Sequence, residues 1–323
     1  MMRVLVTGAN GFVGRQLCRL LTHRGYTVRA ALRMDRGPVQ DAAEHALVGE
    51  IGSATEWAAA LAGVDCVVHG AARAHVMDNP PGESDLYMES NAHGTARLAE
   101  ASAAAGIRRL IYLSSVKVNG ERSGAAPFSP DDSPNPSDAY AVSKWVGETR
   151  LREIAARSDM ETATVRSPLV YGPEVRANFL RLMRLVDRQI PLPLGRIANA
   201  RSLVSVWNLC DLIERLIRGS IPAQAVFMVS DGTDLSTPDL VRRIGAAMRR
   251  RVALLPIPVS ILRALANLTR KRAEFDRLCG TLTVDISSTC RDLNWQPPVS
   301  VEEGIARTVD WYLSLADSRR MSG

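Results

Sequence analysis

The residues best suited to chemistry are a tyrosine and a lysine four positions apart, Tyr140 and Lys144. On a helix these two positions share a face, so both side chains can point at one site. A phenol loses its proton at about pH 10, and a neighbouring ammonium favours the phenolate and lowers its pKa. Ser115, at the end of an expected strand, could hold the same substrate oxygen by a hydrogen bond. The three residues predict a site that exchanges a proton with an oxygen atom. Taken alone, the spacing also fits a buried tyrosine beside a lysine whose ammonium reaches solvent.

A second chemical motif opens the chain, where glycines at 8, 11 and 14 join a strand to a helix. Such glycines allow a tight turn and close approach of the backbone to a pyrophosphate, and the helix N-terminus offers free N–H groups to the phosphates. Three glycines in an ordinary turn are weaker evidence, but their place between strand and helix favours a dinucleotide site. The residues expected to line the cofactor here are Gly8, Asn10, Gly11, Phe12 and Val13. A cationic nicotinamide held here would act together with the ammonium of Lys144 to lower the pKa of Tyr140.

The end of the second expected strand carries Arg33. An acidic residue at this place suits the ribose 2′-hydroxyl of NAD, whereas an arginine suits the 2′-phosphate of NADP. Arg33, with Arg36 nearby, therefore favours NADP(H). NAD stays open, because Asp35 could still serve the hydroxyl and Arg33 could be a solvated side chain.

Alternating strands and helices must position these residues. Expected strands and helices follow one another at the spacing of a Rossmann-like, doubly wound parallel sheet, which is an α/β fold. A loop rich in Gly, Ser, Pro and Asp at 119–138 precedes the helix that carries Tyr140, with Ser137 or Asp138 as its N-cap. The expected strands are Val4–Thr7, Thr27–Leu32, Ala46–Val48, Cys66–His69, Leu110–Leu113 and Thr162–Val165, and the expected helices are Phe12–Arg24, Ala92–Ala105 and Ala139–Arg157.

Past Val170 the alternation weakens and proline and glycine become more frequent. We therefore expect an NAD(P)-binding Rossmann domain over 1–170, with a return of the chain near 203–231, where Val226–Val229 rejoins the sheet. Residues 171–202 and 232–323 are expected to form a smaller, mixed substrate-binding part.

Composition sets broad limits. The 323 residues are 46% hydrophobic and 23% charged, with a net charge of +6 that suits an anionic ligand. No dense Lys/Arg arm indicates nucleic acid, no apolar run reaches the length of a membrane span, and five histidines are scattered without a metal-like grouping. Five cysteines without a CxxC pair, and no secretory leader, favour reduced thiols and a cytoplasmic location. We expect no metal.

These motifs together resemble the extended short-chain dehydrogenases/reductases, in the NAD-dependent epimerase/dehydratase family and its branch of UDP-sugar 4-epimerases and 4-keto-sugar reductases. The matching pieces run from Thr7–Gly14 to Trp295–Pro298. The resemblance implies a Ser115, Tyr140 and Lys144 catalytic triad. It also implies further cofactor contacts at Glu50, Ile51, Ala71, Ala72 and Asn91, in addition to Tyr140 and Lys144.

The resemblance extends to the substrate half through Arg166-Ser167-Pro168-Leu169-Val170-Tyr171-Gly172-Pro173. It implies that Asn178, Arg201 and Arg277 hold a nucleotide diphosphate, which needs fixed, bidentate cations. Each arginine could instead be a plain surface charge. The resemblance also implies a homodimer formed through two long helices.

Two departures from the family pattern bear on function. Lys117 stands in Val116-Lys117-Val118-Asn119-Gly120, where many relatives end in Val-Tyr-Gly, and it either faces the substrate beside Ser115 or extends into water. Arg33 replaces an acid and favours a reductase that draws on NADPH. The leading expectation is thus a 4-keto reductase for a UDP-linked, N-acetylated deoxyhexose of surface polysaccharide synthesis.

Several alternatives remain at this stage. The first is a UDP-hexose 4-epimerase, of the UDP-glucose or UDP-N-acetylglucosamine type, with tightly held NAD. A dehydratase is disfavoured because Val116 and Lys117 stand where an Asp-Glu pair is usual. A lipid-linked sugar 4-epimerase and a non-catalytic dinucleotide sensor are weaker alternatives. The apolar segment Ala246–Arg272, with basic clusters towards its ends, predicts a helix with a solvated basic face or a peripheral contact with a membrane surface.

Overall fold

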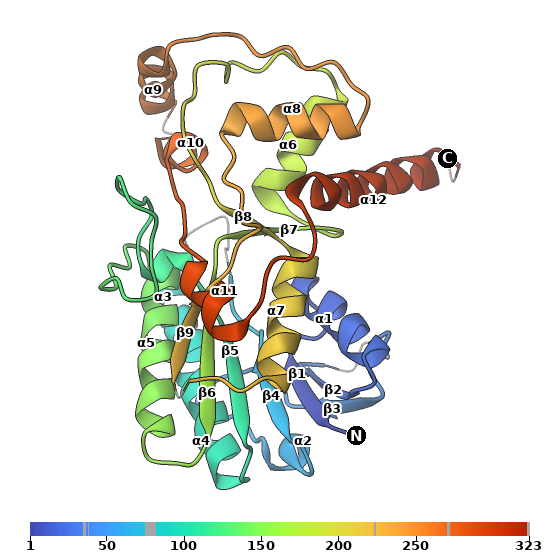
Figure 1. Cartoon of the computed structure of the whole chain (residues 1–323), viewed down its shortest axis with the longest axis vertical. Coiled ribbons are helices and arrows are strands. Elements are labelled where there is room, and N and C mark those ends of the chain that lie inside the picture. Colours follow the sequence, from blue (N-terminus) through green and yellow to red (C-terminus); the bar gives the residue numbers. More distant parts are fainter. Residues whose placement is uncertain (35–36, 38, 75–81, 223, 270–271, 322–323) are drawn as a thin grey trace.

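The computed structural model describes residues 1–34, 37, 39–74, 82–222, 224–269 and 272–321, and only the backbone at 273, 274, 277 and 316–321. Its centre is a seven-stranded, wholly parallel sheet in the order β3-β2-β1-β4-β5-β6-β9 (Figure 1). The strands are β1 (Arg3–Thr7), β2 (Thr27–Leu32), β3 (Glu44–Leu47), β4 (Cys66–His69), β5 (Arg109–Ser115), β6 (Glu161–Ser167) and β9 (Ala225–Met228). The strand order reverses between β1 and β4, the place where such sheets bind ligands.

Helices cover both faces of this sheet because its central strands are apolar on both sides. All four residues of β4 are buried, as in a sheet with two covered faces. Buried residues of α1 (Phe12–His23) and α7 (Val206–Arg218) pack on one face. Those of α2 (Ala58–Leu61), α4 (Gly94–Ala104) and α5 (Ala139–Ala155) pack on the other. The predicted doubly wound α/β fold is confirmed.

Element boundaries differ little from the predictions, with one exception. The expected helix Ala92–Ala105 begins earlier, in α3 (Glu83–Tyr87), and passes through a π-helical turn, η1 (Met88–His93), before α4. A π turn inserts one extra residue per turn and is frequent at functional sites. Apolar periodicity carries no signal for such an insertion, so the sequence did not predict it.

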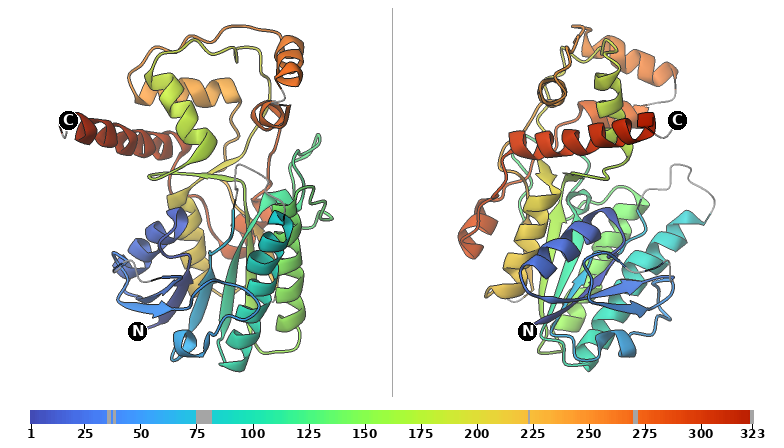
Figure 2. Two further views of the ribbon diagram at one scale, coloured as in Figure 1. Left: turned by 180° about the vertical axis from the view of Figure 1, so that it is seen from behind. Right: turned by 90° about the vertical axis from the view of Figure 1, so that its right-hand side faces the viewer.

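Beyond β6 the chain builds a second layer above the carboxyl ends of the strands (Figure 2). Its core contains buried residues of α6, α8 and α12 around Tyr171. The elements are a two-stranded parallel sheet of β7 (Leu169–Tyr171) and β8 (Leu203–Ser205), with α6 (Ala177–Asp187), α8 (Thr237–Ala247), α9 (Val259–Leu268), α10 (Arg272–Cys279) and α12 (Val301–Met321). Helix α11 (Ser287–Leu293) instead lies beside β9 of the main sheet, and its Leu293 packs in the core of α1 and α7. The expected single helix over Ala246–Arg272 is wrong, because Pro256 and Pro258 separate α8 from α9.

The return to the main sheet takes place at β9, which pairs with β6. The β8 strand instead pairs with β7 in the small sheet, so the return near 203–231 is split between the two layers. The domain boundaries themselves remain a prediction. Within the described residues, no helix is long and apolar enough to cross a membrane.

Candidate active site

Ser115 and Tyr140 meet at the carboxyl edge of the sheet. Ser115 ends β5, and Tyr140 is the second residue of α5. The two hydroxyl groups are hydrogen-bonded to each other. Asp138 fixes the start of α5, since its Oδ1 accepts a hydrogen bond from the Ala141 N–H at 2.7 Å, which confirms an N-cap at one of the two expected positions. Tyr87 packs edge-on against Tyr140, with ring centroids 6.1 Å apart.

Lys144 lies one turn further along α5 and is buried. Its Nζ donates to the Leu113 carbonyl at 2.6 Å and stands 4.3 Å from the centroid of the Tyr112 ring. Burial lowers the pKa of Lys144 to about 7, with Glu148 acting in the opposite direction. Burial raises the pKa of Tyr140 to about 12, and Asp138 adds to the rise. Burial thus opposes the predicted lowering of the tyrosine pKa, which depends on Lys144 and a cationic nicotinamide together and stays a prediction.

The glycine turn has the shape that a pyrophosphate requires. Gly8 is left-handed at φ +70°, and a Cβ there would lie 2.9 Å from the Ala71 backbone nitrogen. A Cβ at Gly14 would overlap the Gly8 carbonyl, so this glycine permits the close packing of helix on strand. Helix α1 begins at Phe12 after Gly11, with no side-chain cap and no acid in its first turn. Its first N–H groups are thus suited to a phosphate, and the turn fits a dinucleotide.

Asn91 connects the segment that follows β4 to α5, the helix of Tyr140. It lies in η1 and is buried, and its side-chain amide donates to the Ser143 hydroxyl at 3.0 Å. The same side chain accepts from the Arg73 N–H and donates to the Arg73 carbonyl. It thereby fixes the backbone that follows β4, which contains Ala71 and Ala72.

Arg33 forms an ion pair with Glu50, 3.2 Å apart, and both side chains are exposed. Two residues expected to touch different parts of the cofactor are therefore each other's counter-ions. Ile51, next to Glu50, is half-buried against the α4 start at Gly94. Arg36 and Asp35 lie outside the described residues.

Lys117 is held between two carboxylates that the sequence did not indicate. Its Nζ lies 2.6 Å from Asp138 Oδ2 and 2.7 Å from Glu121 Oε1. The backbone N–H of Lys117 also donates to Ser115 Oγ at 3.3 Å. Lys117 therefore lies beside the Ser115 and Tyr140 pair and does not extend into water.

Arg201 lies near Glu121, one of the two carboxylate partners of Lys117, and the negative charge of Glu121 acts on its guanidinium. Burial lowers the pKa of Arg201, and its Nη1 donates to the Gly280 carbonyl at 3.0 Å. The carbonyl belongs to the residue that follows α10, the helix of Arg277, whose own side chain is outside the described part. Asn178 is exposed near the start of α6, and no described contact joins it to the group.

A buried ion pair between Arg166 and Glu148 lies beneath the active-site residues, and we call Lys144, Glu148 and Arg166 together the floor of the site. Arg166 donates to both carboxylate oxygens of Glu148, with the shortest distance 2.7 Å, and to Asn119 Oδ1 at 3.1 Å. The Ser114 hydroxyl also donates to Glu148. Arg166, part of the substrate-half resemblance, is thus a structural residue. In the sequence, Glu148 stands four positions after Lys144, and this helical spacing was the signal that could have indicated an acid beside Lys144.

His69, the last residue of β4, is hydrogen-bonded to Thr7 at the end of β1 and to Thr95 of α4. Thr95 donates its one hydroxyl hydrogen to the Asn91 carbonyl, so it must accept from His69 Nε2 at 3.0 Å. Nδ1 of His69 then accepts from the Thr7 hydroxyl at 2.7 Å. Burial lowers the pKa of His69 to about 3, which keeps the ring neutral. It is a structural histidine, and among the described residues no group of His, Cys, Asp and Glu could hold a metal ion.

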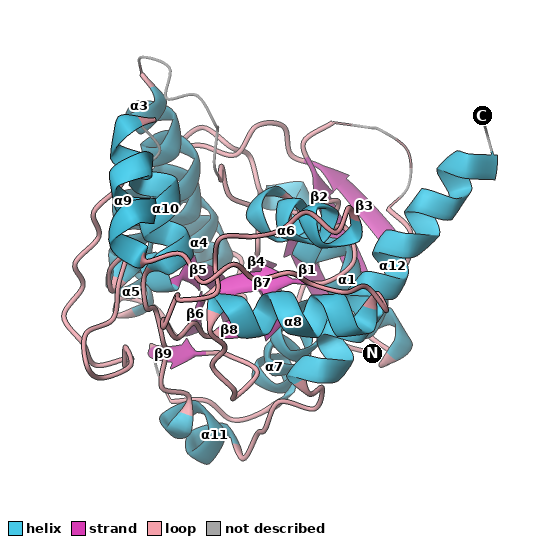
Figure 3. Cartoon of the chain, turned by 90° about the horizontal axis from the view of Figure 1, so that it is seen from above, coloured by secondary structure: helices cyan, strands magenta, loops and turns pink. Residues whose placement is uncertain are grey.

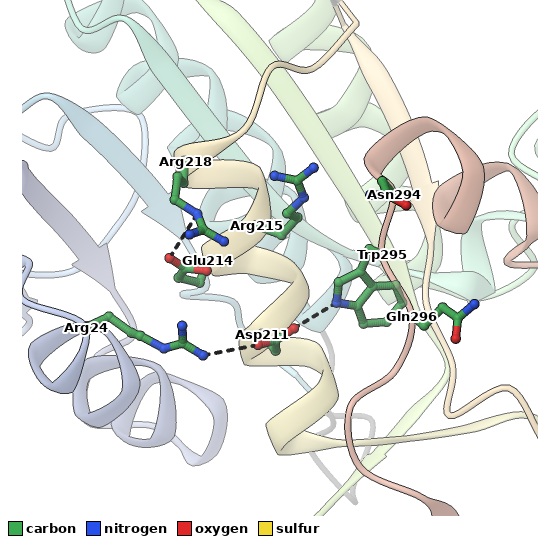
Figure 4. A pocket seen from close by; sticks show the side chains of 8 residues that line it. All are labelled: Arg24, Asp211, Glu214, Arg215, Arg218, Asn294, Trp295 and Gln296. Atoms are coloured by element: carbon green, nitrogen blue, oxygen red, sulfur yellow. Dashed lines mark hydrogen bonds and ion pairs between the residues drawn. The ribbon is translucent and has the colours of Figure 1, made fainter.

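A separate polar depression lies on the outer side of α7 (Figure 4). Asp211 accepts from Trp295 Nε1 at 2.8 Å and pairs with Arg24 at 3.9 Å, while Glu214 pairs with Arg218. These contacts attach the C-terminal segment and α1 to α7. None of the residues that line it is among those predicted for the active site; they are Arg24, Asp211, Glu214, Arg215, Arg218, Asn294, Trp295 and Gln296.

Comparison with known proteins decides the family. The model of the NAD-dependent epimerase/dehydratase family matches residues 4–222. A UDP-glucose 4-epimerase of Vibrio cholerae is 42% identical over 318 residues, which cover 96% of this chain and 95% of that protein. The chain belongs to the NAD-dependent epimerase/dehydratase family. The predictions of this family and of an NAD(P)-dependent enzyme are confirmed.

Solved structures agree with the fold of this epimerase/dehydratase. A UDP-glucose 4-epimerase of Thermotoga maritima, solved with UDP-glucose, has a TM-score of 0.78 at 21% identity, covering 98% of this chain and 100% of that chain. A UDP-glucuronic acid 4-epimerase of Bacillus cereus, solved with NAD, also has a TM-score of 0.78 at 21% identity, covering 97% of this chain and 99% of that chain. The roles of the individual site residues remain predictions.

Proposed function

We propose that this protein is a UDP-hexose 4-epimerase of the UDP-glucose type. The observation that carries the proposal is the 42% identity to the Vibrio cholerae UDP-glucose 4-epimerase over nearly both whole chains. The hydrogen-bonded Ser115 and Tyr140 pair beside Lys144 supports it. The UDP-hexose 4-epimerase was the alternative in the sequence analysis, where a 4-keto reductase was the leading expectation. The similarity to the Vibrio cholerae enzyme supports the epimerase better than the reductase.

The chain's own residues supply the proton chemistry. Ser115 and Tyr140 hold the C4 oxygen of the sugar, and Tyr140 takes the hydroxyl proton and later returns it to the keto oxygen. The glycine turn at Gly8, Gly11 and Gly14 would hold the dinucleotide, whose nicotinamide would supply a reversible hydride acceptor for C4 on either face of the sugar. The electrons and the proton are both restored, so the reaction needs no external reductant.

We place the diphosphate of the substrate beside Arg201, with Asn178 and Arg277 as the further expected contacts. Arg201 is desolvated, and its guanidinium is anchored to the Gly280 carbonyl. A guanidinium fixed in this way loses little freedom on binding a phosphate. Lys117, beside Ser115, would face the sugar.

We further propose NAD as the resident cofactor. The Glu50 carboxylate neutralises Arg33, the residue that favoured NADP(H). Both side chains are exposed, so their pair contributes less than about 1 kcal/mol. Glu50→Gln should therefore raise NADP affinity by about two- to fivefold, while Arg33→Ala should lower it and leave NAD affinity nearly unchanged. Tighter binding of NADP than of NAD by the wild-type protein would contradict this assignment.

The function itself is tested with UDP-galactose and the purified full chain without added cofactor. The epimerase forms UDP-glucose to equilibrium, and denaturing the protein releases NAD in proportion to active sites. Conversion that depends on added NADPH, with none from the UDP-hexoses, would overturn the proposal. Parallel reactions with UDP-N-acetylglucosamine determine whether the N-acetylated sugar is also accepted.

The 4-keto-sugar reductase remains the second candidate because Arg33 stands at the end of β2. Its signature is the oxidation of one NADPH for each 4-keto sugar reduced, measured as the loss of the dihydronicotinamide absorbance. An epimerase consumes no NADPH in this assay.

A further inference from the structure

The end of the molecule farthest from the amino ends of the β-strands is formed by the segment that follows α8 and by α9 (Figures 1 and 2). We call residues 249–268 the end surface. The segment after α8 runs across this end and is attached below by the bridge between Leu192 and Leu254. Helices α9 and α10 then lie side by side (Figure 3).

Helix α9 exposes an apolar stripe to solvent. Ile261, Leu265 and Leu268 are 50%, 53% and 82% exposed. Their spacing of four and three residues places them on one helix face. The opposite face is attached to the protein, with Ala266 buried and Val259 packed on the core of the substrate-binding layer. Leu255, on the segment leading to α9, is also exposed. Four large aliphatic side chains thus face water at one end of the molecule.

The segment that carries this stripe has charge of one sign, whereas Asp276 of the neighbouring α10 is paired with Arg122 and Arg272. Residues 240–273 contain nine of the forty Lys and Arg residues and none of the 34 Asp and Glu residues. The rest of the chain, with 31 basic and 34 acidic residues, is slightly acidic, so this segment accounts for the net positive charge. Arg249, Arg251 and Arg263 are all exposed on the end surface.

We propose that the end surface docks on a bilayer containing anionic phospholipids. An exposed apolar helix face in a segment whose charged residues are all basic has the composition of an interfacial helix, whose aliphatic side chains enter the acyl boundary while cations such as Arg249 and Arg251 meet the headgroup phosphates. A second copy of the chain fits less well, because a twofold contact would place arginines against arginines. A nucleic acid would leave the aliphatic stripe in water. The inference is independent of the sugar that the active site takes.

Co-sedimentation of the full chain with vesicles tests the proposal. Binding to phosphatidylcholine vesicles that contain phosphatidylglycerol should exceed binding to phosphatidylcholine alone by about tenfold, and high salt should remove most of that gain. The Ile261→Ser, Leu265→Ser, Leu268→Ser variant should lose about tenfold or more in binding. The matched control is Leu47→Ser with Leu86→Ser, which removes two comparably exposed leucines on β3 and α3 and should bind as the wild type does.

A second variant, Arg249→Ser with Arg251→Ser and Arg263→Ser, should keep weak binding but lose the preference for anionic vesicles. Circular dichroism and epimerisation of UDP-galactose, or cofactor binding if that activity is absent, confirm that the variants are folded. Full binding by the Ile261/Leu265/Leu268 variant, or no sedimentation of the wild type with any vesicle, overturns the proposal. A wild-type dimer in light scattering that becomes a monomer in that variant also overturns it, in favour of a second copy.

Discussion

The floor of the candidate active site and the end surface differ in how their charged side chains are surrounded: those of the floor are buried and paired, and those of the end surface are exposed to water. In the floor, Lys144, Glu148 and Arg166 are almost completely buried, and Glu148 and Arg166 are held by several hydrogen bonds. At the end surface, arginines and aliphatic side chains stand in water on one helix and one connecting segment. A buried charge without partners costs several kcal/mol, so the floor has a single arrangement. The exposed end tolerates change, because replacing a solvated side chain leaves no buried charge without a partner.

The largest expected effect comes from the reacting hydroxyl. Tyr140→Phe removes the group that exchanges the proton and should lower kcat by about 10²- to 10⁴-fold. Dinucleotide affinity should change little, since the glycine turn is intact. Tyr87→Phe is the matched control, because Tyr87 packs against the same ring without touching Ser115 in the described contacts. Near-normal turnover in Tyr140→Phe would show that the Tyr140 hydroxyl does not exchange the proton.

The next effect concerns stability. Arg166→Met leaves the Glu148 carboxylate buried without its cation and should lower the free energy of unfolding by about 3–5 kcal/mol. The double variant Arg166→Met, Glu148→Met should recover much of this loss, because both charges are removed together. Thermal unfolding measures both. A double variant as unstable as the sum of the two single ones would mean that packing, and not charge, is what the pair provides.

The smallest effect is on pH dependence. Lys117→Met leaves Asp138 without its cation, and the freed negative charge should raise the pKa of Tyr140 above its value of about 12. Because the reaction uses the deprotonated phenol as base, the rising limb of the kcat profile should move to higher pH, by less than about one unit. Asp138→Asn removes the same charge but keeps an N-cap, so it should move the limb the other way. Movement in the same direction by both variants would contradict this coupling.

Sequence reasoning predicted the fold well because its signals are local. The alternation of apolar strands and helices and the glycine turn each lie within a few residues, and the structure has them where expected. The pairing of Ser115 with Tyr140 also followed, since parallel strands end at one edge of the sheet. Asp138 was missed as a partner of Lys117, because the long loop over 119–138 brings it there. Glu121 stands only four positions after Lys117, but no helix was predicted there to give this spacing a meaning. The opposing effect of burial on the tyrosine pKa was also missed, since burial cannot be read from the spacing of Tyr140 and Lys144.

The order of the strands has a consequence for synthesis on the ribosome. Strand β6 ends at Ser167, but its outer neighbour β9 begins only at Ala225, after β7, α6, β8 and α7. Translation of that interval takes several seconds at about 5–20 residues per second. During this time the outer edge of β6 has no native strand to pair with, and an open edge invites pairing with other chains. Nascent chains that stall between these strands are therefore the species most exposed to aggregation, although the finished protein closes this edge.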